Sequence, residues 1–196
     1  VYEVCAVLGG KLLDFEGHWA RLLRSLDGLG IPLRVDKKPL AVILDQVIKR
    51  NRLKDGIIYF QMTRGVASRD HAIAHSPLPS LVVTAKRLDF KGKAALARYG
   101  VGAISAPDMR WSRCDVKSIS LLPNVLVKEV ARRHGAYEAW MVGEDTLIRE
   151  GTSTNIWIVD GDGVLRTHPL SDRILGGITR DVLCALADGL GLRLEE

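Results

Sequence analysis

Two short polar motifs restrict the fold and chemistry of this chain more than any other feature. The first reads Cys-Asp-Val-Lys-Ser-Ile-Ser-Leu-Leu-Pro-Asn at 114–124 and contains Lys117. The second reads Glu-Gly-Thr-Ser-Thr-Asn at 150–155 and begins with Glu150, 33 positions after the lysine. A lone lysine and a Glu-Gly turn are both common in proteins, so the spacing alone indicates little. The residues that surround Lys117 and Glu150 carry the information.

Both motifs resemble those of the class IV aminotransferases, which are enzymes that use pyridoxal 5'-phosphate (PLP). Such an enzyme needs a lysine that forms a Schiff base with the cofactor and an acid that pairs with its pyridine nitrogen. The resemblance assigns these roles to Lys117 and Glu150. It runs through essentially all 196 residues, and it is closest to the branch of the family that acts on D-amino acids.

The chemistry of such a site depends on the charge states of both residues. Lys117 would carry a proton between the substrate Cα and the cofactor, first as a base and then as an acid, which requires a lowered pKa. Glu150 would keep the pyridine ring protonated as a carboxylate. Ser153 and Asn155 are expected to shape the turn after Glu150 and to orient the cofactor, although capping of the turn explains these two residues equally well.

A third motif, Gly-Gly-Ile-Thr-Arg at 176–180, lies where a helix should begin. Exposed amides at the start of a helix suit a phosphate dianion, and glycines allow the backbone to approach it closely. The resemblance places the amides of Ile178 and Thr179 on the cofactor phosphate. It also matches Arg21 to an arginine that pairs with this phosphate, and Leu175 to a bulky residue that packs on the cofactor ring.

The substrate residues distinguish the members of this family. An Arg-x-His motif formed by Arg69 and His71 resembles the trap that binds the substrate α-carboxylate in D-amino acid aminotransferases, together with a tyrosine that matches Tyr2. A guanidinium can bind a carboxylate through two hydrogen bonds, and the other two side chains add further donors. In that family Arg69 and His71 would project from a neighbouring subunit, so the resemblance implies a homodimer.

The resemblance also implies a mixed α/β (α+β) fold of two domains, called fold type IV. We expect a small N-terminal α/β domain at 1–88, an interdomain linker at 89–94 and a larger, β-rich α/β domain with the PLP site at 95–196. Both domains should be truncated, because the family's usual N-terminal strand and a C-terminal stretch with a further phosphate-binding loop have no counterpart in the 196 residues.

Local patterns predict where the helices and strands lie. Apolar residues at helical spacing predict one helix at 16–29 and another after Asp36. Further helices are expected at 122–134 and 177–190. Runs of alternating, β-branched and aromatic residues predict strands, which we place at 1–8, 11–15, 57–63, 81–85, 101–106, 136–142, 155–159 and 164–167.

Composition excludes several other classes of protein. The net charge is +5, but the basic residues are scattered and do not form the dense, aromatic-interleaved stripe typical of nucleic-acid binding. No apolar run is long enough for a membrane span, and no signal peptide is visible. The three cysteines form no metal-binding or disulfide pattern, which favours a reduced, cytoplasmic setting.

The sequence therefore predicts PLP-dependent transamination from D-amino acids such as D-alanine to 2-oxo acids such as 2-oxoglutarate. An aminodeoxychorismate lyase, a branched-chain aminotransferase and an amine transaminase of the same fold are the alternatives. For the lyase, whose substrate is bulky and aromatic, and for the branched-chain enzyme we expect a different substrate loop in place of Arg69 and His71. An amine transaminase, whose substrates lack a carboxylate, would have little use for the carboxylate trap. A catalytically inactive binding protein is a further alternative, and cofactor binding followed by reaction with an amine donor would distinguish it.

Overall fold

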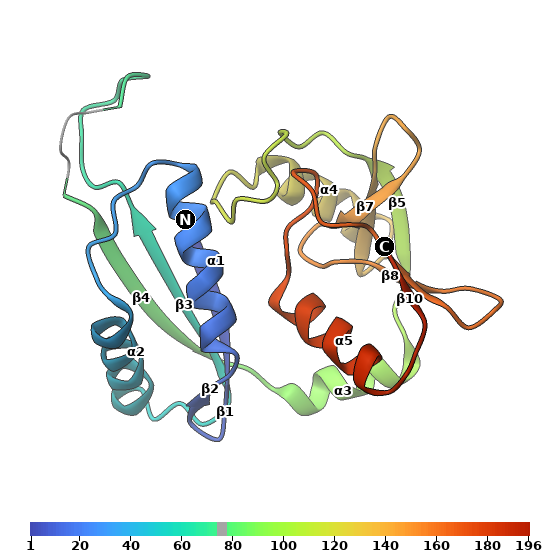
Figure 1. The fold of residues 1–196 in the computed structure, drawn as a ribbon, viewed down its shortest axis with the longest axis horizontal. Coiled ribbons are helices and arrows are strands. Elements are labelled where there is room, and N and C mark those ends of the chain that lie inside the picture. Colours follow the sequence, from blue (N-terminus) through green and yellow to red (C-terminus); the bar gives the residue numbers. More distant parts are fainter. Residues whose placement is uncertain (74–77) are drawn as a thin grey trace. The chain divides into compact units, whose positions relative to one another are not determined.

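The computed structural model describes residues 1–73 and 78–196, and the chain divides into two units. The first unit consists of Val1–Ala94 together with Val116–Ile119. The second consists of Ala95–Asp115 and Ser120–Glu196. Figure 1 shows the elements of each unit along the chain. The short segment that carries Lys117 thus belongs to the first unit, although the residues on both sides of it belong to the second.

In the first unit, four strands form an antiparallel sheet in the order β2-β1-β3-β4 (Figure 1). The strands are β1 (Tyr2–Leu8), β2 (Lys11–Leu12), β3 (Gly56–Thr63) and β4 (Ser80–Arg87). Every second residue of β3 is buried, because successive side chains of a strand point to opposite faces of its sheet. One face of the sheet can therefore form a core while the other remains available for a site.

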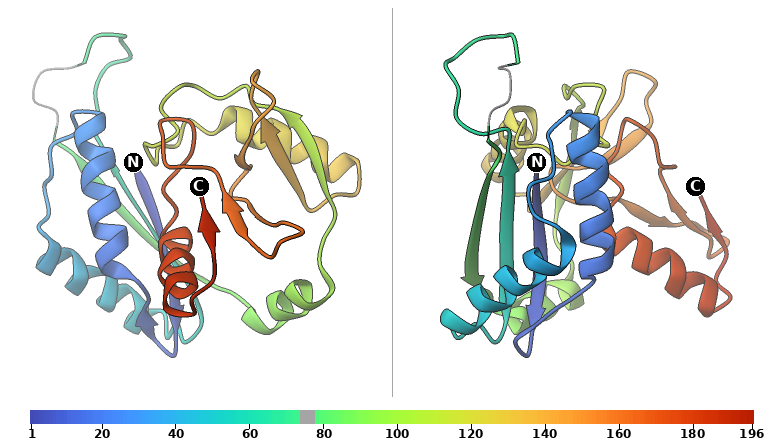
Figure 2. Two further views of the ribbon diagram at one scale, coloured as in Figure 1. Left: turned by 45° about the vertical axis from the view of Figure 1, so that its right-hand side comes forward. Right: turned by 60° about the vertical axis from the view of Figure 1, so that its left-hand side comes forward.

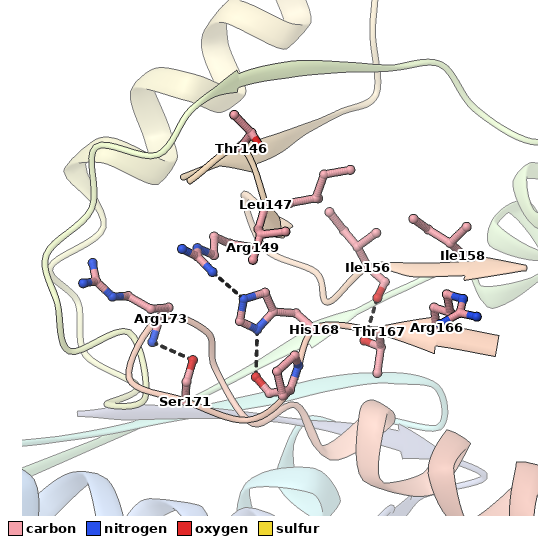
Figure 3. Close-up of a pocket in the computed structure, with 12 residues that line it drawn as sticks. Thr146, Leu147, Arg149, Ile156, Ile158, Arg166, Thr167, His168, Ser171 and Arg173 are labelled. Atoms are coloured by element: carbon pink, nitrogen blue, oxygen red, sulfur yellow. Dashed lines mark hydrogen bonds between the residues drawn. The ribbon is translucent and has the colours of Figure 1, made fainter. Parts of the chain in front are cut away.

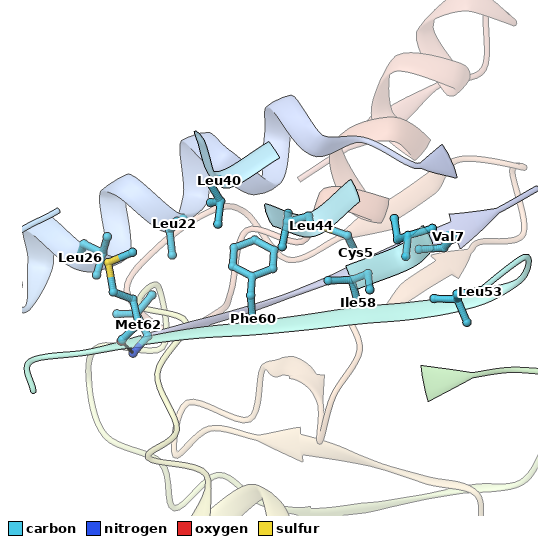
Figure 4. Close-up of a cluster of buried hydrophobic side chains, with 12 residues drawn as sticks. Cys5, Val7, Leu22, Leu26, Leu40, Leu44, Leu53, Ile58, Phe60 and Met62 are labelled. Atoms are coloured by element: carbon cyan, nitrogen blue, oxygen red, sulfur yellow. Dashed lines mark hydrogen bonds between the residues drawn. The ribbon is translucent and has the colours of Figure 1, made fainter. Parts of the chain in front are cut away.

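Helices α1 (Phe15–Gly28) and α2 (Lys37–Arg50) pack their apolar sides on one face of this sheet. Figure 4 shows the aromatic ring of Phe60 among side chains from both helices and from the strands. Phe60 is fully buried. The buried cluster consists of Val1, Cys5, Val7, Leu22, Leu26, Leu40, Leu44, Ile48, Leu53, Ile58, Phe60 and Met62.

Both of these helices confirm the sequence prediction to within about two residues, which is the usual uncertainty of helix ends. Strand β2 is shorter than the predicted 11–15. The reason is Asp14, whose φ of 52° places it in the left-handed region and turns the chain directly into α1. Phe15 consequently begins the helix instead of ending the strand.

The second unit contains two sheets of three strands each (Figure 2). In the first sheet, β6 pairs in parallel with β5 and antiparallel with β7. In the second, β9 pairs antiparallel with β8 and in parallel with β10. The strands are β5 (Ala103–Pro107), β6 (Glu138–Val142), β7 (Ile148–Gly151), β8 (Trp157–Val159), β9 (Leu165–Thr167) and β10 (Leu194–Glu195).

Helix α4 (Leu122–Arg133) covers the first of these sheets. Its Val127 and Ala131 are buried against Ala139 and Met141 of β6. Helix α5 (Ile178–Gly189) follows the Gly-Gly motif, as predicted, with Gly177 immediately before its first turn.

Two elements were not predicted. Strand β7 ends at Gly151, so Glu150 lies on a strand and not in a loop. Helix α3 (Phe90–Tyr99) includes most of the predicted linker at 89–94. The predicted division into domains at 1–88 and 95–196 stays a prediction. Within residues 1–73 and 78–196, no helix is both long enough and apolar enough to cross a membrane.

Candidate active site

Lys117 is held in the first unit by its backbone. Its N–H donates to the hydroxyl of Ser25 on α1 at 3.0 Å, and its carbonyl accepts a hydrogen bond of 3.0 Å from the N–H of Tyr2. The neighbouring side chains of Val116 and Ser118 are both buried. The main chain around the lysine is thus fixed at the start of β1, while the side chain is only partly buried.

Tyr2 lies beside this lysine, as the prediction of a common site requires. The Nζ of Lys117 is 4.5 Å from the centroid of the Tyr2 ring, and this ring stacks on that of Tyr59 with 5.5 Å between centroids. Burial raises the pKa of Tyr2 above its ordinary value, so its phenol is neutral at physiological pH. Sequence reasoning missed Tyr59, although its alternation with the buried Ile58 and Phe60 places it on the face of the sheet opposite the core.

Arg21 lies in a buried ion cluster of the first unit. Its Nε and Nη2 donate to the two carboxylate oxygens of Glu3 at 2.9 and 2.6 Å. The Nδ1 of His18 lies 2.7 Å from Glu3 Oε2. Burial alone would raise the pKa of Glu3, but the hydrogen bonds from Arg21 and His18 outweigh it and lower this pKa. The role of Arg21 in phosphate binding stays a prediction, and its contact with Glu3 fixes where the guanidinium lies.

Acidification is expected to destabilise the first unit through Glu3. A carboxylate whose pKa is depressed below 4.5 by folding stabilises the folded state above that pH. This contribution is lost as the pH falls through the pKa of the folded protein. Urea unfolding between about pH 6 and pH 3 should therefore show a falling midpoint. The variant Glu3→Gln should be less stable near neutrality and less sensitive to acid.

Glu16 provides the control for this experiment, because its side chain lies on the same helix as Arg21 but is 78% exposed. Glu16→Gln should keep the acid sensitivity of the wild type. If Glu3→Gln and the wild type lost stability equally with falling pH, Glu3 would not be the carboxylate responsible.

Arg69 and His71 lie on the connection that follows β3, and both are exposed. Asp70 between them accepts hydrogen bonds from the N–H groups of His71 and Ala72 at 2.6 and 3.3 Å, which orders this part of the loop. The structure therefore brings Lys117 and Tyr2 together but leaves Arg69 and His71 at the surface of the chain.

Glu150, the predicted acid of the site, lies in the second unit and is 5% exposed. Its Oε2 accepts hydrogen bonds of 3.1 Å from the side-chain amide of Asn155 and from the N–H of Leu175. Its Oε1 accepts a hydrogen bond from Nη1 of Arg110. Burial raises the pKa of Glu150 above its ordinary value, and the charge of Arg110 opposes that rise.

Arg110 and Asp108 were not identified from the sequence. The Nε and Nη2 of Arg110 donate to the two oxygens of Asp108 at 2.9 and 2.8 Å. Burial alone would lower the pKa of Arg110, but its contacts with Asp108 and Glu150 raise it. The only signal in the sequence is an acid and an arginine two positions apart in a loop without periodicity, a pattern that is usually a solvated surface pair.

The turn after Glu150 is built from buried polar contacts. Glu138 accepts hydrogen bonds from the backbone and the hydroxyl of Thr152, and Asn124 donates to the Thr152 carbonyl at 2.9 Å. A Cβ on Gly151 would lie 2.2 Å from the hydroxyl of Thr154, so a larger residue there would force the Thr154 side chain to move. Ser153 is exposed at the tip of the turn. The contacts of Thr152 thus shape the turn, and the roles predicted for Ser153 and Asn155 stay predictions.

The same asparagine links Glu150 to the start of α5. Its side-chain amide also donates to the carbonyl of Leu175 at 2.9 Å. A Cβ on Gly177 would lie 2.1 Å from Oδ1 of Asn155, which explains the glycine at this position. Of the two residues predicted to hold the phosphate, Ile178 is buried and Thr179 is exposed, and both lie in the first turn of α5. Glu150, Leu175 and the amide end of α5 are therefore held by one set of contacts.

These observations agree with the comparison of this sequence with known families. Residues 1–196 match the family described as amino-transferase class IV. The chain is a class IV aminotransferase. The result confirms the family and the enzyme class that the motifs around Lys117 and Glu150 predicted.

Individual relatives extend this result. The aminotransferase is 39% identical to a D-alanine aminotransferase from Bacillus licheniformis over 196 residues, which are all of this chain and 68% of the relative. Its fold resembles the branched-chain aminotransferase of Thermoproteus uzoniensis solved with norvaline, with a TM-score of 0.86, 26% identity and coverage of 67% of that chain. It also resembles the PLP-bound form of a hypothetical aminotransferase from Mycobacterium tuberculosis, with a TM-score of 0.85, 23% identity and coverage of 70% of that chain. Each comparison covers all of this chain, and the α/β fold of type IV is confirmed.

A pocket of about 660 Å³ lies elsewhere in the second unit of this aminotransferase (Figure 3). Arg149 lines it and donates to Nε2 of His168 at 2.6 Å, whereas Glu150 is not among its lining residues. Two neighbouring residues of β7, Ile148 and Arg149, both line this largely apolar pocket.

Proposed function

We propose that this class IV aminotransferase transfers the amino group of a D-amino acid such as D-alanine to a 2-oxo acid such as 2-oxoglutarate. Membership in the family implies PLP as the cofactor. The identity of the substrate is supported by the D-alanine aminotransferase relative. The observation that carries the proposal is the position of the Lys117 amine 4.5 Å from the ring centroid of Tyr2, because these are the residues proposed for proton transfer and for carboxylate binding.

The environment of Glu150 fits the ring of PLP. An ionised carboxylate offers about four lone-pair sites to hydrogen-bond donors. Among the described residues, Arg110, Asn155 and the amide of Leu175 donate to Glu150. A protonated ring nitrogen can be the fourth donor, and Leu175, next to this carboxylate, would pack on the ring. We propose that Ser153, at the tip of the adjoining turn, helps to orient the cofactor.

The start of α5 fits the cofactor phosphate. The first amides of a helix have no acceptor within the helix, and the helix dipole favours an anion there. We propose that the amides of Ile178 and Thr179 bind the phosphate. The guanidinium of Arg21, oriented by Glu3, would supply the positive charge.

Bound PLP supplies an electron sink that stabilises negative charge at the substrate Cα. The Nζ of Lys117 would accept the proton released at the substrate Cα and would hold it for the next proton transfer, acting first as a base and then as an acid. Glu150, as a carboxylate, would pair with the protonated ring nitrogen. Tyr2 donates a hydrogen bond to the substrate carboxylate, since burial keeps its phenol neutral.

We further propose that the carboxylate trap is completed in a homodimer by the partner's Arg69 and the partner's His71. Both residues are exposed in this chain, so they are available to a second copy. A carboxylate held by Tyr2 and this arginine fixes which hydrogen of Cα faces Lys117. That geometry would select the D enantiomer.

The test is a single-turnover experiment with the PLP-loaded protein, D-alanine and L-alanine, and no 2-oxo acid. We expect D-alanine to remove the visible absorbance of the bound PLP. L-alanine should leave this absorbance unchanged. Addition of 2-oxoglutarate should then restore the absorbance. A reaction with L-alanine alone, or with neither enantiomer, would overturn the D-specific assignment and favour a branched-chain aminotransferase or a lyase.

A further inference from the structure

The second unit contains an arginine that none of the roles above explains. Arg110 lies in the loop after β5, and its side chain is 4% exposed. Its guanidinium contacts Asp108 with two nitrogens and Glu150 with the third, and Nη2 also donates to the carbonyl of Arg173 at 3.0 Å. All of its donor nitrogens therefore have acceptors, and two of these acceptors are carboxylates.

Asp108 anchors this arginine to the sheet. The N–H of Asp108 donates to the carbonyl of Val142, the last residue of β6, at 2.8 Å. Its Oδ1 also accepts the backbone N–H of Arg110 at 3.0 Å. Because β6 pairs directly with β7, the guanidinium is attached to the strand beside the one that carries Glu150, and its position is fixed before any ligand binds.

We propose that Arg110 is a positioning residue that keeps the Glu150 carboxylate charged and in one orientation, so that it can hold a proton on the cofactor's ring nitrogen. This proposal rests on the proposed function, in which Glu150 is the partner of that nitrogen. Arg110 itself does not contact the cofactor in this assignment. It acts through Glu150, as outer contacts commonly do for the groups that bind a ligand.

The charges around Glu150 support this role. Burial opposes ionisation of Glu150, and the neighbouring Asp108 charge opposes it further. The other two donors to Glu150 are the neutral amides of Asn155 and Leu175. Arg110 is therefore the cation that compensates the carboxylate among these contacts.

The formal charges of Asp108, Arg110 and Glu150 also predict which kind of ligand these three side chains prefer. Asp108 and Glu150 carry one negative charge each and Arg110 carries one positive charge, so these three hydrogen-bonded side chains sum to −1, while the charge of Arg149 also acts on Asp108. The nearby Cys114 adds none, because burial raises the pKa of its thiol to about 11. A buried net negative charge favours a cationic partner, and a protonated pyridine nitrogen is such a partner.

Arginine is required here, and lysine would not replace it. A planar guanidinium can bind one carboxylate through two nitrogens and a second through its third nitrogen, whereas an ammonium is a single point of charge. Arg110→Lys would keep the charge but could not hold Asp108 and Glu150 in this arrangement. Arg110→Ala would remove both the charge and the bridge.

The experiment measures the protonation of the ring nitrogen directly, by nitrogen NMR of bound PLP labelled with ¹⁵N in its ring, as a function of pH. Without Arg110, the buried carboxylates of Asp108 and Glu150 lose their shared cation, which favours protonation of Glu150, and a neutral Glu150 no longer stabilises a charged ring nitrogen. We therefore expect Arg110→Ala to lower the pKa of the ring nitrogen by at least about one unit, equivalent to a tenfold change in the protonation equilibrium, and to weaken PLP binding. Arg110→Lys should show a smaller shift of the same sign. If Arg110→Ala does not fold, the lysine variant provides the measurement.

Arg113→Ala is the matched control. Arg113 also pairs with an aspartate two positions away, at 2.9 Å from Asp115, but its side chain is 45% exposed. It should leave the ring nitrogen and the affinity for PLP unchanged. Circular dichroism of each variant establishes that the fold is intact.

Glu150→Gln separates this proposal from the proposed function on which it rests. If the glutamine variant loses the proton of the ring nitrogen while folded arginine variants keep it and bind PLP normally, the role of Arg110 is refuted and that of Glu150 stands. If the glutamine variant also keeps the proton, Glu150 is not the partner of the nitrogen and the proposed site itself is wrong.

Discussion

Replacing Lys117 with alanine is expected to lower the rate of transamination by a factor of about 10² to 10⁴, the usual contribution of a positioned acid–base group. The lysine is the proposed carrier of the Cα proton, and the amine lies within 4.5 Å of the Tyr2 ring centroid. The measurement is single-turnover reaction of D-alanine with the PLP-loaded variant.

The structure predicts that this variant folds. Both hydrogen bonds that fix the segment, to Ser25 and from Tyr2, involve backbone atoms of Lys117 that alanine retains. A small primary amine such as methylamine, added to the solution, should restore part of the rate by carrying the proton in place of Nζ.

Lys49→Ala is the control for a loss of positive charge, since the Lys49 side chain is 67% exposed on α2 and pairs with Asp45. It should react like the wild type. A rate for Lys117→Ala within tenfold of the wild type, or no response to added amine, would show that another group moves the proton.

Replacing Phe60 with alanine is expected to destabilise the first unit by about 3–5 kcal/mol, the usual cost of removing a buried aromatic ring. Phe60 is fully buried in the centre of the cluster between the sheet and helices α1 and α2 (Figure 4). Its backbone pairs with Glu3 in β1 and Val83 in β4, so the ring lies under the middle of the sheet. Urea unfolding monitored by circular dichroism measures the change.

Val42→Ala serves as the control, because Val42 is also apolar but is 61% exposed on α2. It should alter the stability by no more than about 0.5 kcal/mol, as exposed substitutions usually do. If Phe60→Ala lost as little unfolding free energy as the control, the buried cluster would not be what stabilises this unit.

The helices and most strands could be predicted because their burial has a regular period. The leucines of α1 and α2 recur at helical spacing, and the strands of the first sheet alternate between a buried and an accessible face. The prediction failed for β7 because its four residues contain two charged side chains, Arg149 and Glu150, whose burial depends on distant partners. It failed for α3 because the glycine and charges near its start suggested a linker.

The site could be predicted only as far as its residues belong to recognisable motifs. Lys117, Glu150 and the start of α5 stand in such motifs, and their family is confirmed. Arg110 and Asp108 could not be found, since the pairing of Arg110 with Glu150 joins positions 40 residues apart. Tyr59 was missed because a tyrosine in a strand has no signal beyond alternation. Arg69 and His71 lie in an exposed loop, so the predicted trap for the substrate carboxylate stays a proposal.

The return of Val116–Ile119 to the first unit has a consequence for the modularity of this protein. The chain leaves the first unit after Ala94, re-enters it at Val116 and leaves it again after Ile119. No single cut can therefore divide the gene into two pieces that each encode one complete unit. A piece ending at Ala94 would lack the buried Val116 and Lys117, the proposed catalytic lysine. Recombination that exchanges one unit between relatives would need three crossovers, which favours joint inheritance of the two units.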